Sequence, residues 1–149
     1  LPKWNDGPAR FTLVAGQGYG RIAPIPVYSD LFMIEIMTEA AYHLDVRGHL
    51  VGEIGICIVE GAVMACEEEI TAGHILVSKV EDSCTIVVKE NTHLLLFGGQ
   101  SFEEERFIDW NFVSSSKQKI EAAKSAWQQK SFPMIPHDDT YVPIPNASK

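Results

Sequence analysis

Cysteine is scarce in this sequence, and the spacings that make metal knuckles or redox pairs are missing. Cys57, Cys66 and Cys84 are the three cysteines among 149 residues, and none of them belongs to a Cys-x-x-Cys pair. A small, odd count is typical of reduced thiols rather than of a disulfide framework, and it favours a cytoplasmic protein. We interpret Cys57, which lies in the apolar stretch EIGICIVEG, as a small core residue.

Long apolar runs, basic clusters and phosphate-binding motifs are also missing. No apolar run approaches the roughly 20 residues that a membrane-spanning helix needs. The net charge is −8, and no cluster of Lys and Arg could neutralise a row of phosphates. The stretch AGQGYG has the glycines of a phosphate loop, but neither a helical pattern nor Gly-Lys-Ser/Thr follows it. We therefore expect neither a membrane nor nucleic acid as a direct partner.

The sequence does contain a series of short segments with strand periodicity. In LFMIEIM, residues 31–37, the side chains of Phe32, Ile34 and Ile36 share one face, which predicts a half-buried strand. EIGICIVE is apolar on both faces, which predicts a strand that is covered on both sides. Turn residues recur about every eight to twelve residues, a spacing typical of an all-β sandwich or barrel.

A helical pattern appears near the end of the chain. Ser115 followed by Gln118 forms a capping box, in which the serine accepts from a free N–H and the glutamine reaches back. Ile120 and Trp127 lie at helical spacing, and Pro133 disfavours helix at the residue before it. The sequence therefore predicts one C-terminal amphipathic helix that buries a stripe against the sheet.

These patterns divide the chain into three expected parts. Residues 1–10 are a polar arm, residues 11–113 form the β-barrel, and residues 114–149 form a helix and an extended tail that pack on the barrel. Three aromatic residues near the helix are expected to anchor the core or an interface: Trp110, Phe112 and Trp127.

Parts of the sequence resemble the pirin family. The stretch HLLLFGGQSFEEERFIDWNFVSSSKQKIEAAKSAWQQKSFPMIP, residues 93–136, resembles the C-terminal portion of pirin-like proteins, in which WNFVSSS precedes a helix. FTLVAGQGYG and YSDLFMIEI resemble the opening of the same domain. GQSF stands where the family has GEPL, and ACEEEI replaces a glycine-rich turn. Because pirins contain two cupins, the resemblance implies a cupin-type double-stranded β-helix, or jelly-roll sandwich, with one C-terminal helix.

The resemblance also implies where a metal belongs. Bacterial pirins are described as quercetin 2,3-dioxygenases, and nuclear eukaryotic members as iron-dependent transcriptional co-regulators. The family's site of three histidines and a glutamate holds iron or another divalent transition metal in the N-terminal cupin. This sequence resembles the second half and has no residue that matches that site. We therefore expect no cofactor and no catalytic residue in this domain.

The residue spacing also argues against a metal site in this domain. A metal centre inside a cupin needs several imidazoles and a carboxylate that converge. In RGHLVGEIGICIVEG, His49 and Glu53 occupy two of the ligand positions of a cupin, but Arg47 occupies the position of a second histidine ligand. Leu76 occupies the position of the histidine ligand that a cupin has later in the chain. Residues four apart in an extended strand lie roughly 13 Å apart, so His49 and Glu53 could share an ion only if the chain bends. His93 is a further weak candidate ligand.

Three functions follow from these observations. The first is a metal-free cupin module, structural or regulatory, that packs against the N-terminal cupin or a second copy of itself as a homodimer. The second is a part of a quercetin 2,3-dioxygenase-like, metal-dependent enzyme. The third is a small-molecule binder that uses the barrel cavity without a metal. The missing ligands favour the first, and we do not expect catalysis by this domain alone.

Overall fold

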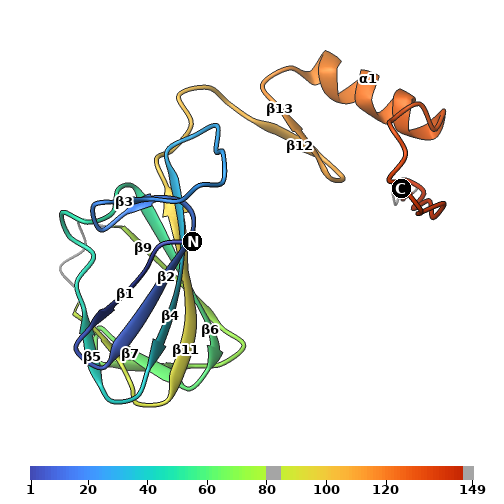
Figure 1. Ribbon diagram of the computed structural model, residues 1–149. Coiled ribbons are helices and arrows are strands. Elements are labelled where there is room, and N and C mark those ends of the chain that lie inside the picture. The colour runs from blue at the N-terminus through green and yellow to red at the C-terminus, as the bar shows by residue number, and fades with distance from the viewer. Residues whose placement is uncertain (80–84, 146–149) are drawn as a thin grey trace. The chain divides into compact units, whose positions relative to one another are not determined.

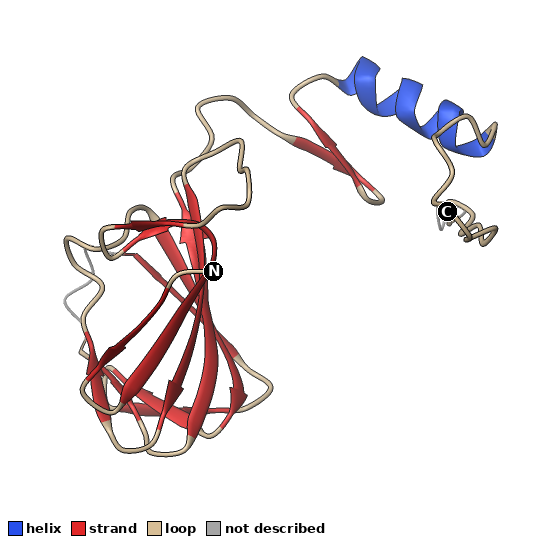
Figure 2. Cartoon of the chain, viewed as in Figure 1, coloured by secondary structure: helices blue, strands red, loops and turns tan. Residues whose placement is uncertain are grey.

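The computed structural model describes residues 1–79 and 85–145. The chain separates into two compact units, Leu1–Ser101 and Phe102–Lys149, which are described here as unit 1 and unit 2. The expected boundary at residue 113 lies inside unit 2. The packing of the helix and tail on the expected barrel stays a prediction. Figure 2 shows that the helix belongs to unit 2, while the described regular elements of unit 1 are strands.

Unit 1 consists of two antiparallel sheets that face each other (Figure 1). The larger sheet has the order β1–β2–β4–β11–β6–β9, and β3 pairs with β2. Its strands are β1 (Lys3–Asp6), β2 (Ala9–Gly18), β3 (Arg21–Ile22), β4 (Leu31–Thr38), β6 (Glu53–Glu60), β9 (Ile75–Lys79) and β11 (Thr92–Gly99). The smaller sheet has the order β5–β10–β7–β8. Its strands are β5 (Tyr42–Leu44), β7 (Ala62–Ala65), β8 (Glu68–Thr71) and β10 (Ile86–Val88).

The core lies between the two sheets. Phe11 and Ile36 of the larger sheet belong to the same buried cluster as Val63 and Val88 of the smaller sheet. The alternation predicted for residues 31–37 is confirmed, because every second residue of β4 is buried and the residues between are not. The apolar period of two in the sequence therefore decides which face of the larger sheet turns inward.

The two sheets form a sandwich and are not closed into a barrel. Among the described strands, no backbone pairing joins the larger sheet to the smaller one. Strands β1 and β5 are joined instead by side chains, since the Tyr42 hydroxyl donates to Asp6 Oδ2 at 2.6 Å. The predicted all-β jelly-roll sandwich is confirmed, but the predicted barrel is corrected, because closure needs a continuous backbone ladder around the structure.

Residues 1–10, which we expected to be an arm, contain a strand of the larger sheet. β1 pairs antiparallel with β2, and Trp4 lies opposite Phe11 in this ladder. The two rings stack with centroids 4.9 Å apart. This contact anchors the start of the chain on the sheet, because the stacking of half-buried Trp4 on buried Phe11 adds to the backbone hydrogen bonds.

The structure corrects two further expectations. The outer side of β6 is not covered within unit 1, since Cys57 is half-buried and Val59 is exposed. Cys66 takes part in a disulfide, whereas Cys57 is a free thiol, so the expectation of reduced thiols is wrong for Cys66. Cys84 lies outside the described residues.

Unit 2 contains a short hairpin and one helix. The hairpin is formed by β12 (Phe107–Asp109) and β13 (Phe112–Ser114), and α1 (Lys117–Gln128) packs against both strands. Residues 129–145 contain neither helix nor strand. No helix among the described residues is long and apolar enough to cross a membrane.

The helix cap lies one residue later than predicted. Ser116 is the N-cap, and its Oγ accepts a hydrogen bond from the Lys119 N–H at 3.4 Å. The expected pair of Ser115 and Gln118 therefore forms no capping box. With Ser116 as the cap, the third helical residue is Lys119, which has no carbonyl or carboxylate to reach back to the cap.

Candidate functional site

The space between the sheets, where a cupin would hold a metal, is filled by apolar side chains. No histidine, aspartate or glutamate of the described residues is buried. The largest fully buried side chains are Phe11, Leu13, Phe32, Ile34, Ile36, Ile54, Ile56, Ile58, Val63, Val88, Leu94 and Leu96. An interior of this composition offers no ligand for a hard or borderline metal ion, which needs oxygen or nitrogen donors.

The buried polar groups of this interior serve the backbone. The Thr38 hydroxyl donates to the Lys89 carbonyl at 2.7 Å. The Thr92 hydroxyl donates to the Ala62 carbonyl at 3.1 Å and accepts from the Ala62 N–H at 3.2 Å. No buried side-chain nitrogen or oxygen among the described residues lacks a partner. These threonines therefore join the two sheets and present no unpaired atom to a ligand.

The predicted ligands His49 and Glu53 lie at the surface. The imidazole of His49 stacks on the ring of Tyr19, with centroids 4.7 Å apart and planes 15° apart. Glu53 is exposed at the start of β6, opposite Gly99 of β11. No three His, Cys, Asp or Glu side chains of the described residues are grouped to hold a metal.

His93, the third weak candidate, forms a hydrogen bond with Glu35 on the outside of the larger sheet. Its Nε2 lies 3.1 Å from Oε1 of Glu35, and the two side chains are 27% and 36% exposed. His93 stands on β11 opposite Met37 of β4, and Glu35 is the next outward residue of β4. Sequence reasoning placed Glu35 on the outward face of its strand but did not identify His93 as its partner.

Apolar side chains surround this hydrogen-bonded pair. We define the outer face as the outward side chains of β4, β11, β6 and β9: Leu31, Met33, Glu35, Met37, His93, Leu95, Phe97, Glu53, Cys57, Val59, Ile75 and Val77. Ile75 and Val77 are 58% and 70% exposed. The Phe97 ring lies over Gly55, where a Cβ would come within 2.7 Å of the ring. The outer face is therefore mostly apolar, which is typical of a surface that another protein covers.

A cluster of aromatic residues that the sequence did not predict lies where β1, β2 and β5 meet. Tyr19 lies 5.5 Å from Phe11 and donates its hydroxyl to the Asp45 carbonyl at 2.7 Å. Burial, followed by the charges of its neighbours, raises the pKa of Tyr19 well above its ordinary value. Burial and then the hydrogen bond to Asp6 do the same to the pKa of Tyr42. Both hydroxyls therefore stay protonated at neutral pH and act as donors that hold the sheets together.

Unit 2 brings together the three predicted aromatic anchors. Trp127 of α1 lies 5.3 Å from Trp110 and 6.4 Å from Phe112, measured between ring centroids. All three are half-buried. The tail that follows the helix adds Phe132 and Tyr141 to the same cluster, each 5.7 Å from Trp127. The sequence did not predict that the tail folds back onto Trp127, because the apolar residues of the tail follow neither the period of a strand nor that of a helix.

Comparison with known proteins identifies the domain. Residues 32–133 match the family model described as the pirin C-terminal cupin domain. A pirin-like protein of Caulobacter vibrioides is 30% identical over 147 residues, which are 97% of this chain and 50% of that protein. A putative quercetin 2,3-dioxygenase of Pseudomonas aeruginosa is 31% identical over 135 residues, which are 87% of this chain and 41% of that protein. The chain thus spans about half the length of the curated relatives it matches.

A solved structure supports the same fold. The crystal structure of a quercetin 2,3-dioxygenase from Acinetobacter baumannii superposes with a TM-score of 0.83 at 22% sequence identity. The superposition covers 99% of this chain and 51% of that protein. The cupin fold that the resemblance implied is therefore confirmed.

Proposed function

Because this chain belongs to the pirin family, whose C-terminal cupin domain it contains, we propose that it is a metal-free module that packs against a second cupin. The partner would be the N-terminal cupin of the same original chain, or a second copy of this domain. The role is structural or regulatory, and no residue of this chain acts as a catalytic group.

The composition of the sandwich interior carries this proposal. The inward positions of β2, β4, β6 and β11 are apolar or threonine, and the threonine hydroxyls are bonded to the backbone. The imidazoles of His49 and His93 are engaged outside the sandwich by Tyr19 and Glu35. The residues present therefore do not fit a cupin metal centre, and no chemical step is assigned to one.

Elemental analysis tests the proposal that this domain binds no metal. The untagged protein is purified without chelators, incubated with Fe, Mn, Ni or Co, passed over a desalting column and analysed for bound metal. We expect far less than one ion per chain. About one ion per chain, lost together in His49→Ala and His93→Ala, would contradict the proposal.

The outer face supports the packing role. It combines exposed aliphatic side chains on β9 with the flat ring of Phe97 on β11. The pair of Glu35 and His93 lies among these apolar side chains, and Oε1 of Glu35 already has a hydrogen-bond partner in Nε2 of His93. A partner that covers the face would therefore gain apolar burial without depriving Glu35 of a hydrogen bond, which is the costly case.

Sedimentation analysis tests the outer face as a contact surface. We expect the protein to self-associate at high concentration in place of its missing partner, and Val77→Glu to shift it toward monomer. Ile22→Glu is the matched control, because Ile22 is 75% exposed on β3 and lies outside the outer face. A strictly monomeric protein at high concentration, or equal effects of the two variants, would count against the proposal.

The names of the relatives favour a second candidate function. A putative quercetin 2,3-dioxygenase is among the similar proteins, so a longer chain containing this domain could be a metal-dependent enzyme of that kind. In that case the domain would support a centre held by the N-terminal cupin. This chain alone, supplied with quercetin and Fe, Mn, Ni or Co, is expected to show no turnover. Turnover by this chain alone would place the enzyme activity within it.

A further inference from the structure

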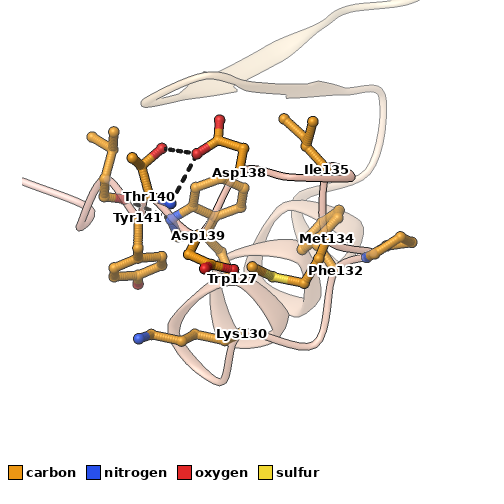
Figure 3. Close-up of a pocket in the computed structure, with 11 residues that line it drawn as sticks. Trp127, Lys130, Phe132, Met134, Ile135, Asp138, Asp139, Thr140 and Tyr141 are labelled. Carbon is orange, nitrogen blue, oxygen red and sulfur yellow. Dashed lines mark hydrogen bonds between the residues drawn. The ribbon is translucent and has the colours of Figure 1, made fainter.

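A pocket of about 290 Å³ lies within unit 2, between the end of α1 and the tail that follows it (Figure 3). Its lining residues are Trp127, Lys130, Phe132, Pro133, Met134, Ile135, Asp138, Asp139, Thr140, Tyr141 and Val142. The volume is close to the lower end of the range of small-molecule sites, about 300 Å³. None of these residues belongs to the sandwich interior or to the outer face, and the proposed function does not use the pocket.

The tail is held against the helix by Trp127. The indole N–H of Trp127 donates to the Val142 carbonyl at 2.8 Å. Tyr141 stacks on the indole, with planes 25° apart, and Phe132 meets it edge-on. The walls of the pocket are therefore fixed by ring contacts and one hydrogen bond, so that the hollow exists before a ligand arrives.

Several apolar walls of the pocket are open to solvent. Phe132 is 40% exposed, Met134 61% and Ile135 69%. These three side chains follow one another closely in the tail and border the same hollow, as Figure 3 shows. A flat apolar group placed between them would remove this surface from water, which is the main source of affinity in such pockets.

The charged groups of the pocket favour a cation. Two carboxylates, Asp138 and Asp139, line it together with one ammonium, that of Lys130. The Lys130 Nζ already lies over the Tyr141 ring, 4.9 Å from its centroid. In the view of Figure 3, Lys130 and Asp138 lie on opposite sides of the pocket, with Asp139 between them.

One carboxylate of the pair keeps an oxygen available. Asp138 Oδ1 accepts from the Thr140 hydroxyl at 2.6 Å and from the Thr140 N–H at 2.9 Å. These two hydrogen bonds, the side-chain one first, hold the pKa of Asp138 below its ordinary value. Asp138 is therefore charged at neutral pH and fixed in orientation, and its Oδ2 remains free to accept from a ligand.

We propose that this pocket binds a small molecule that joins one aromatic ring system to a cationic amine. The ring lies against Phe132, Met134 and Ile135. The ammonium group donates to Asp138 Oδ2, and the carboxylate of Asp139, which also lines the pocket, adds to the attraction for a positive charge. The aromatic walls add a second attraction, because the faces of aromatic rings are electron-rich and attract cations.

Calorimetric titration with three indole probes tests the charge preference. Tryptamine carries the ammonium, indole is neutral and indole-3-propionate is an anion. We expect tryptamine to bind about tenfold more tightly than indole, which is the effect of a charge-assisted hydrogen bond, and the anion to bind most weakly. Equal affinity for tryptamine and the anion, or no binding of tryptamine, would overturn the proposal.

Variants locate the site. Asp138→Asn combined with Asp139→Asn keeps the acceptor for Thr140 and should lower tryptamine affinity about tenfold while leaving indole binding unchanged. Glu103→Gln removes one charge elsewhere in unit 2 and should change neither. Met134→Trp places a large ring in the hollow and should abolish binding of all three probes. Near-UV circular dichroism confirms that each variant keeps the Trp127 cluster. Unchanged tryptamine binding in the double Asn variant or in Met134→Trp would overturn the assignment.

Discussion

Replacing Thr92 by Val should destabilise unit 1 by about 2 kcal/mol. Thr92 is 2% exposed, and its hydroxyl both donates to the Ala62 carbonyl and accepts from the Ala62 N–H. Valine has nearly the same shape, so the change creates no cavity. It leaves the Ala62 N–H without its Thr92 partner, at a cost of about 1 to 3 kcal/mol, whereas the Ala62 carbonyl still accepts from the Lys89 N–H at 3.0 Å.

The tryptophans of the chain allow this loss to be measured on unit 1 alone. Trp4 belongs to unit 1, where it stacks on Phe11, whereas Trp110 and Trp127 belong to unit 2. In a background that carries Trp110→Phe and Trp127→Phe, fluorescence during urea titration reports the unfolding of unit 1. The midpoint should fall in the Thr92→Val variant while the slope stays the same, as expected for a change in stability only.

Thr12→Val is the matched control for this experiment. Thr12 lies on the larger sheet and is 9% exposed, and its hydroxyl forms no hydrogen bond within the part of the chain that the structure describes. Its replacement should change the free energy of unfolding by less than about 0.5 kcal/mol. A loss of that small size in Thr92→Val, or equal losses in both variants, would refute the idea that Thr92 supports the backbone of Ala62.

Two further predictions concern the helix cap and the tyrosines. Ser116→Ala should reduce the stability of unit 2 by about 1 kcal/mol, whereas Ser115→Ala should have little effect, as measured by thermal melts followed by circular dichroism. The raised pKa of Tyr42, which follows from burial and then from the bond to Asp6, predicts a loss of stability in alkali. Stability should be fully present below about pH 10, the ordinary tyrosine pKa, and should fall as pH rises further, because only the unfolded chain then ionises. Urea titrations across this range should show a smaller fall in Tyr42→Phe, and a pH-independent stability would contradict the assignment.

The strands of the larger sheet could be predicted from the sequence because their apolar residues alternate. The pattern of Phe32, Ile34 and Ile36 agrees with the burial of β4. The acidic run after Cys66 was harder to interpret. Most of it forms strand β8, because pairing with β7 satisfies its backbone whatever the side chains are.

Contacts between residues far apart in the chain were beyond the reach of local patterns. The bond between Tyr42 and Asp6 joins residues 36 positions apart, and the pair of His93 and Glu35 joins residues 58 positions apart. The type of residue does not predict its hydrogen-bond partner, because tyrosine and histidine occur both in cores and at surfaces. The metal candidates His49, Glu53 and His93 were likewise judged by spacing, and their actual partners depend on how the sheets meet.

Gly55 and Phe97 of the outer face constrain how this domain can change over evolutionary time. The Phe97 ring rests on the backbone of Gly55, and any side chain at position 55 would enter the volume of the ring. A side chain at position 55 therefore requires either that the Phe97 ring moves or that a smaller residue replaces it. The two positions should consequently vary together among related sequences, although they lie on different strands.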